Sequence, residues 1–129
     1  MICSTRLIFL ALLILLALFV SASPTCVGLS GELRKSGDVT NYTTRRKTTV
    51  ANGVTITVKN LGNCSGIKLL KLRLNVNGKT RDWITFTDTE IGTPKTLGSL
   101  PKGTEFTLDS QVNPSSCWGT PQFTANICY

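Results

Sequence analysis

The chain has 129 residues, a formal net charge of +7 and no histidine. The lack of histidine excludes a Ser-His-Asp triad, a Cys-His pair, a histidine general base and the common histidine-rich metal sites. We therefore expect a protein that is not an enzyme and that binds no metal or cofactor. The positive charge favours anionic partners.

The chain begins with a segment typical of a secretory signal peptide. After a short start that carries Arg6, residues 7–20 form an unbroken apolar run (LIFLALLILLALFV). This run is shorter than the roughly 20 apolar residues that a membrane-spanning helix needs. Val20, Ser21 and Ala22 suit the positions that a signal peptidase reads. We predict a signal peptide over residues 1–22, cleavage after Ala22 and a secreted, extracellular protein.

Cleavage would leave a mature chain of residues 23–129, which is the length of one domain. Its four cysteines are Cys26, Cys64, Cys117 and Cys128. An even number of cysteines in a small secreted domain predicts two disulfides, and four cysteines allow three pairings. We favour Cys26 with Cys64 and Cys117 with Cys128, and the main alternative joins Cys26 to Cys128. A monomer is expected.

Hydrophobic residues after residue 22 repeat with a period of two, which is typical of half-buried strands. The alternation is clearest in residues 54–59, 70–77, 105–109 and 123–128. No segment shows a helical stripe, and many threonines and valines favour a pleated sheet. The sequence predicts an all-β fold, namely a small antiparallel β-sandwich or barrel of six to eight strands.

Turn residues separate these strands. Asn52-Gly53 and Asn77-Gly78 are strong hairpin signals, and residues 100–103 (LPKG) form a third predicted turn. Around Asn77-Gly78, a two-residue turn would place Arg73 opposite Asp82. A bulged, three-residue turn instead pairs Leu72 with Ile84 and Leu70 with Phe86 and brings Arg73 near Trp83. Two buried apolar pairs outweigh one exposed ion pair of at most about 1 kcal/mol, so we predict the bulged turn.

Basic residues supply the candidate binding sites. Arg45, Arg46 and Lys47 are the densest basic cluster, and Tyr42 could stack on a sugar or base beside them. Equally, these charges could mark a solvated edge strand that resists aggregation. Further along, the candidate binding residues are Lys71, Arg73 and Trp83.

Three other features have weaker interpretations. Trp83 and Trp118 could bind sugar faces, but packing in the core or beside a disulfide explains them as well. Asp88 and Glu90 are better explained as a polar turn after a strand than as a catalytic carboxylate pair. Asn41 begins the sequon Asn-Tyr-Thr and is the preferred glycosylation site if the source is eukaryotic.

No family-specific motif is found in the sequence. We expect a secreted, cationic, non-catalytic protein of the effector or antimicrobial type that binds an anionic surface, glycan or protein of another organism. The alternatives are a hydrolase inhibitor or other protein-binding module, whose rigid loop would be 88–95 or 113–122, and a carbohydrate-binding module that uses Tyr42, Trp83 or Trp118. Nucleic acid is not an expected partner, because no nucleic-acid-binding motif is present.

Overall fold

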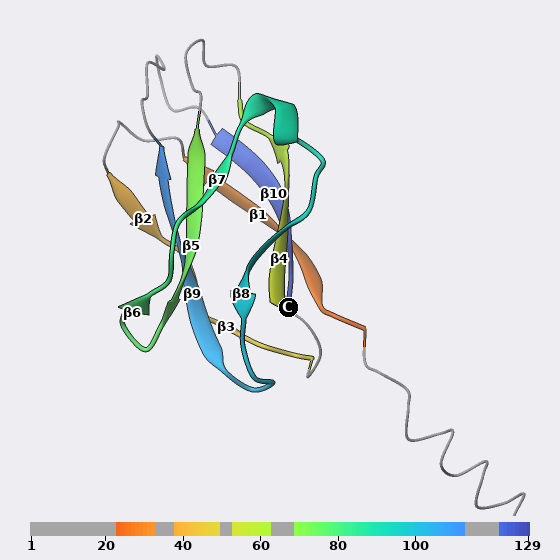
Figure 1. Ribbon diagram of the computed structural model, residues 1–129, viewed down its shortest axis with the longest axis vertical. Coiled ribbons are helices and arrows are strands. Elements are labelled where there is room, and N and C mark those ends of the chain that lie inside the picture. Colours follow the sequence, from red (N-terminus) through yellow and green to blue (C-terminus); the bar gives the residue numbers. More distant parts are fainter. Residues whose placement is uncertain (1–22, 33–37, 50–52, 63–68, 113–121) are drawn as a thin grey trace, which may run out of the picture.

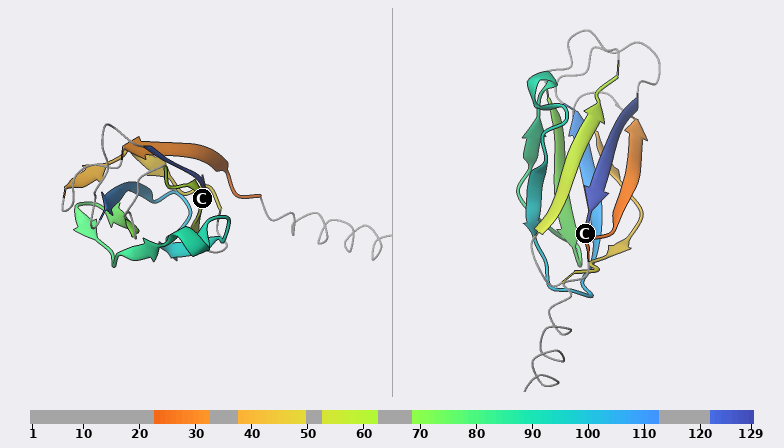
Figure 2. Two further views of the ribbon diagram at one scale, coloured as in Figure 1. Left: turned by 90° about the horizontal axis from the view of Figure 1, so that it is seen from above. Right: turned by 90° about the vertical axis from the view of Figure 1, so that its right-hand side faces the viewer.

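Two antiparallel β-sheets lie on opposite sides of one apolar core in the computed structural model (Figures 1 and 2). The structure describes residues 23–32, 38–49, 53–62, 69–112 and 122–129. The first sheet has the order β1-β10-β4-β8, formed by Cys26–Glu32, Gln122–Cys128, Gly53–Asn60 and Lys95–Ser99. This arrangement confirms the expected all-β fold.

The second sheet has the order β2-β9-β5-β6, and two short strands join it at the side. These four strands are Val39–Asn41, Glu105–Val112, Leu70–Val76 and Lys79–Thr80. Strand β3 (Arg45–Arg46) pairs with β9, and β7 (Ile84–Phe86) pairs with β5. The described residues form ten strands, more than the expected six to eight, because β2, β3, β6 and β7 are only two or three residues long.

The predicted alternation separates the core from the solvent-facing sides of the sheets. In β4, β5, β9 and β10 the alternate apolar residues are almost fully buried, including Val54, Ile56, Val58, Leu70, Leu72, Leu74, Phe106, Leu108, Phe123 and Ile127. Burial of such side chains contributes about 1.5–3 kcal/mol each. The residues between them face outward, so each strand offers every second side chain to a surface site.

The predicted turns differ in their outcomes. Asn77 and Gly78 have φ angles of 53° and 78°, and Val76 pairs with Lys79, as in a two-residue type I′ turn. Leu72 nevertheless pairs with Ile84, as predicted, because the irregularity lies in residues 81–83 and not in the turn. The register was therefore predicted correctly and the position of the bulge was not.

Gly53 does not belong to a hairpin turn. It is the first residue of β4 and pairs with Ser99, whereas the preceding strand β3 belongs to the other sheet. A Cβ atom at this position would lie 2.6 Å from the carbonyl oxygen of Gly98. Close approach of β4 to β8 therefore accounts for this glycine. The turn at residues 100–103 is present, with the amide of Thr104 donating to the carbonyl of Pro101.

A disulfide joins Cys26 to Cys128, which lie directly opposite each other on β1 and β10. The favoured pairing of Cys26 with Cys64 and of Cys117 with Cys128 is therefore wrong. The alternative pairing is correct because β1 and β10 are adjacent strands, a non-local contact that spacing alone does not reveal. Cys64 and Cys117 lie outside the described residues.

Removal of this disulfide should destabilise the fold. Cys26 and Cys128 are 102 residues apart, so their bond restricts a long loop in the unfolded chain. We expect the double variant Cys26→Ala/Cys128→Ala to lose about 2–5 kcal/mol of unfolding free energy, measured by urea denaturation. Peptide mapping without reductant should recover Cys26 linked to Cys128, and a link from Cys26 to Cys64 would contradict this strand pairing.

Candidate functional site

A row of polar side chains crosses the outer face of the second sheet. The strand register places Asn41, Asp109 and Arg73 side by side on β2, β9 and β5. Arg73 Nε donates to Asp109 Oδ2 at 3.0 Å, and Asn41 Nδ2 donates to Asp109 Oδ1 at 2.7 Å. Only 3% of Asp109 is exposed. These two partners satisfy both of its carboxylate oxygens, as a buried charge requires.

Trp83 continues this row on the other side of Arg73. The guanidinium carbon of Arg73 lies 4.1 Å from the centre of the Trp83 ring, which is a cation–π geometry. This contact was predicted from the register of β5 and β7. The bulged register was also predicted to separate Arg73 from Asp82. This is confirmed, because the acidic partner of Arg73 is Asp109. Trp83 is half-buried, so part of its ring remains accessible.

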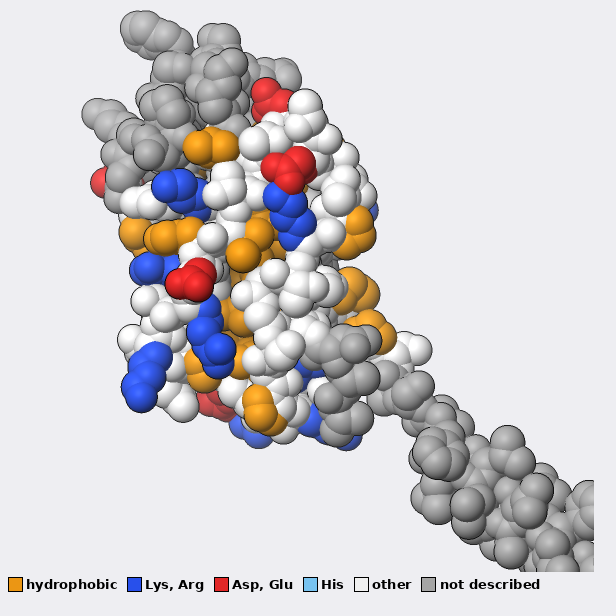
Figure 3. All heavy atoms as spheres, viewed as in Figure 1, with side chains coloured by type: hydrophobic (Ala, Val, Ile, Leu, Met, Phe, Trp, Pro, Cys, Tyr) orange, Lys and Arg blue, Asp and Glu red, His pale blue; other side chains and the backbone are white. Residues whose placement is uncertain are grey.

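Further cations follow Arg73 along the side of the sheet formed by β5, β6 and β7. We call Lys71, Arg73, Lys79 and Arg81 the cationic edge. Lys79 and Arg81 are exposed and Lys71 is half-buried. None of these three side chains has an acidic partner among the described residues. Figure 3 shows Lys and Arg side chains spread over this side of the molecule.

The structure does not bring Arg45, Arg46 and Lys47 together as one exposed patch. Only 1% of Lys47 is exposed, and its Nζ donates to the backbone carbonyl of Thr49 at 3.0 Å. Arg46 is exposed but lies 2.6 Å from Glu105. Arg45 is half-buried and donates to the carbonyl of Thr43. Burial and ion pairing thus leave these three cations less available than the cationic edge.

Tyr42 packs against the core and does not stand beside the basic residues as a stacking platform. Its ring meets Phe123 edge-to-face at 6.2 Å, and its hydroxyl lies 2.7 Å from Ser110 Oγ. Such a half-buried tyrosine satisfies its polar tip inside the fold. Trp118, the other aromatic residue considered for sugar binding, lies outside the described residues.

A polar hollow of about 320 Å³ lies next to the cationic edge. Its walls come from β2 and the residues after it, from the start of β9, and from the β5–β6 turn. The polar lining residues are Asn41, Thr44, Asn75, Asn77, Glu105 and Thr107. Asn75 of the hollow and Arg73 of the cationic edge lie two residues apart on the outward face of β5, so the hollow borders the edge there.

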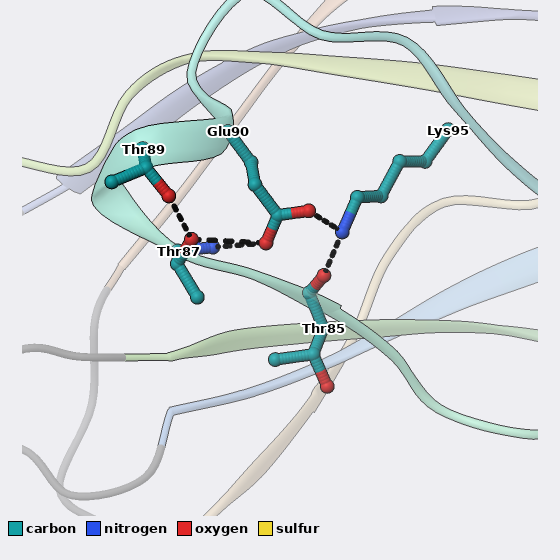
Figure 4. A network of polar contacts seen from close by, with 5 residues as sticks. All are labelled: Thr85, Thr87, Thr89, Glu90 and Lys95. Atoms are coloured by element: carbon teal, nitrogen blue, oxygen red, sulfur yellow. Dashed lines mark hydrogen bonds and ion pairs between the residues drawn. The ribbon is translucent and has the colours of Figure 1, made fainter.

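The loop before β8 is held by a polar network (Figure 4). Residues Asp88–Glu90 form a 3-10 helix, η1, whose capping box joins Thr87 to Glu90. Glu90 also forms an ion pair with Lys95, and Lys95 Nζ donates to the carbonyl of Thr85 at 2.6 Å. Glu90 thus serves the turn, as favoured over a catalytic pair with Asp88. Ile91, which follows η1, is 43% exposed.

Asn41, the preferred glycosylation residue, already donates hydrogen bonds from its amide nitrogen. Nδ2 donates to Thr107 Oγ1 at 3.0 Å as well as to Asp109. A glycan on Nδ2 would remove one of these two donors. Glycosylation of Asn41 therefore stays a prediction that competes with the polar row.

The sequence-based candidates included Lys71, Arg73 and Trp83 but not Asp109, Lys79 or Arg81. The outward position of Asp109 in the alternation of β9 and the basic residues after Asn77-Gly78 were signals that could have indicated them. Searches against family models, curated proteins and solved structures find no match to this chain. The described part of the chain holds no helix able to cross a membrane and no cluster of three potential metal ligands.

Asp109 should contribute more to stability than an exposed carboxylate. We expect Asp109→Ala to lower the unfolding free energy by about 1–3 kcal/mol, because Arg73 and Asn41 lose their shared partner at a buried position. The matched control is Glu105→Ala, on the same strand and face, which breaks the exposed Arg46 pair and should cost less than about 1 kcal/mol. Equal losses in urea denaturation would contradict the proposed role of Asp109.

The Glu90 network should make stability depend on pH. The hydrogen bond from Lys95, followed by that from Thr87, lowers the pKa of Glu90 below its ordinary value of 4.5. A carboxylate with a lowered pKa stabilises the fold above its unfolded pKa and loses this contribution as the pH falls through the folded pKa. The stability difference between wild type and Glu90→Gln should therefore be constant near neutral pH and shrink below pH 4.5.

Lys95→Met provides the control for this pH dependence, because it removes the main cause of the lowered pKa. In that background, Glu90→Gln should change the pH dependence of thermal unfolding much less. A pH-dependent difference of the same size with and without Lys95 would show that another group is responsible.

Proposed function

We propose that this protein is a secreted, non-catalytic binding protein of the effector or antimicrobial type that attaches to an anionic surface of another organism through the cationic edge. The observation that supports this most is that Lys71, next to Arg73 on the outward face of β5, and Lys79 and Arg81 at the border of the same sheet have no acidic partner among the described residues. Clustered cations raise the local concentration of an anionic partner and speed its association.

The surroundings of the edge suit this role. Asp109 holds Arg73 by one nitrogen, Nε, and its remaining guanidinium donors have no partner among the described residues. Trp83 adds an amphipathic ring that can contact a ligand next to these donors. A tied chain end and, as expected from the two remaining cysteines, a second disulfide between Cys64 and Cys117 would suit a protein that works outside the cell.

A protein-binding module is the second candidate, and the η1 loop favours it. The network of Glu90, Lys95 and Thr87 stiffens the loop, and Ile91 projects next to it with 43% of its surface exposed. A preorganised loop loses little entropy on binding. This role would not depend on the cationic edge, so its binding would persist at high salt.

Neutralising the edge tests the proposal. We expect Lys79→Gln/Arg81→Gln to reduce binding to phosphatidylserine-containing vesicles and to polygalacturonate gel by about tenfold or more at low salt. The control Lys59→Gln/Lys102→Gln removes the same charge from exposed lysines outside the edge, and it should have little effect. Cosedimentation at low and high salt measures both variants.

Three results would overturn the proposal of an electrostatic edge. Equal losses in both variants would mean that only net charge matters, and unchanged binding in both would mean that neither set of cations takes part. Binding to a single protein from a secreted-protein extract at high salt, lost in Ile91→Asp, would instead support the second candidate.

A further inference from the structure

We infer that the polar hollow beside the cationic edge is a sugar subsite, and that the anionic partner is an acidic polysaccharide. This inference rests on the proposed function and names the class of ligand that would bind. The hollow has the size of a small-molecule site, since its volume of about 320 Å³ lies within the usual range for such pockets.

The lining supplies hydrogen-bonding groups that the fold leaves unused. Asn75 and Asn77 have side-chain amides with no partner among the described residues, and so does the hydroxyl of Thr44. An amide offers two donors and a carbonyl acceptor, and a hydroxyl both donates and accepts. A ligand with many hydroxyl groups needs this mixture of donors and acceptors, whereas a phosphate or carboxylate alone needs only donors.

The hollow also contains acceptors, which argue against a simple anion site. Asn41 uses its amide nitrogen on Asp109 and Thr107, so its carbonyl oxygen is the atom that remains available. Glu105 Oε1 binds Arg46, and no described donor occupies its second oxygen. A carboxylate oxygen repels an anion but accepts a hydrogen bond from a sugar hydroxyl. The hollow is therefore suited to hydroxyl groups and the neighbouring edge to acidic groups.

The hollow and the outward cations Lys71 and Arg73 share one face of β5, so one polymer can contact both. Asn75 lies two residues after Arg73 and four after Lys71 on the same outward face of β5. Lys79 pairs with Val76, so it follows the turn on the other side of this border. A polysaccharide with an acidic group on successive sugars would place hydroxyls in the hollow and carboxylates or sulfates on the edge. Trp83 stands at the Arg73 end, where its ring could stack on a further sugar.

The test compares polymers that share charge but differ in sugar content. Wild-type protein from secretory expression of the full chain is titrated by calorimetry with polygalacturonate and with poly-glutamate of matched length. Both carry one carboxylate per unit, and only the first has ring hydroxyls. We expect polygalacturonate to bind about tenfold more tightly, from two or more additional hydrogen bonds. Dextran sulfate replaces the carboxylates with sulfates and identifies the preferred acid.

The variant Asn75→Ala/Asn77→Gly removes both unused amides. Glycine suits the positive φ at position 77, so the turn should persist. This variant should lower the affinity for polygalacturonate to that for poly-glutamate and leave poly-glutamate binding unchanged. Asn126→Ala is the matched control, because it removes a half-buried asparagine on β10 in the other sheet. Thermal unfolding confirms that both variants are folded.

The failures of the two proposals are distinguishable. Equal affinity for the sugar polymers and poly-glutamate, unaffected by Asn75→Ala/Asn77→Gly, would overturn the sugar subsite and leave the electrostatic edge intact. No binding of wild type to any of these polyanions or to anionic vesicles would overturn the proposed function and the subsite together.

Discussion

The antiparallel pairing of β5 with β9 is the constraint on which both the core and the candidate site depend. In this register Leu74 lies opposite Leu108 on the inner face, and Arg73 lies opposite Asp109 on the outer face. A slip of one residue would exchange the faces of a strand. It would then bury Asp109 against the core without Arg73, at a cost of several kcal/mol. The same register thus selects the apolar core and assembles the polar row.

The pairing of β1 with β10 is the corresponding constraint in the first sheet. Among the described strands, β1 pairs only with β10, so its place depends on β10. The disulfide lies at one end of this pair, and reciprocal backbone hydrogen bonds between Thr25 and Tyr129 extend the pairing past it. Because these contacts join segments about 100 residues apart, their loop-closure entropy is large and a covalent bond offsets part of it. The first sheet is therefore complete only when both chain ends are in place.

Local patterns in the sequence predicted the inner faces of the strands and the pairing of β5 with β7, but they did not predict which strands far apart in the sequence become neighbours. Alternation identified Leu70 and Leu72 as core residues, and the preference for apolar pairs placed Leu72 opposite Ile84. Lys47 follows the short strand β3, and its burial arises from contacts with residues far along the chain, including Thr104. Charge density along the sequence could not show this. For the same reason the cysteine pairing and the partner of Arg73 were beyond local reasoning.

The distribution of acidic partners decides which cations are available for binding. Arg46 forms an ion pair with Glu105, Arg73 with Asp109 and Lys95 with Glu90. Each of these positive charges is therefore neutralised by a neighbouring carboxylate. Lys71, Lys79 and Arg81 have no such partner among the described residues, and β6 and β7 are short strands at the border of their sheet. Charged residues at such a border also discourage aggregation of exposed strands. Turn geometry accounts for Asn77, whose φ is 53°, but neither the turn nor protection of the edge requires the amide of Asn75. The combination of this amide with these cations is what favours a ligand with both acidic groups and hydroxyls.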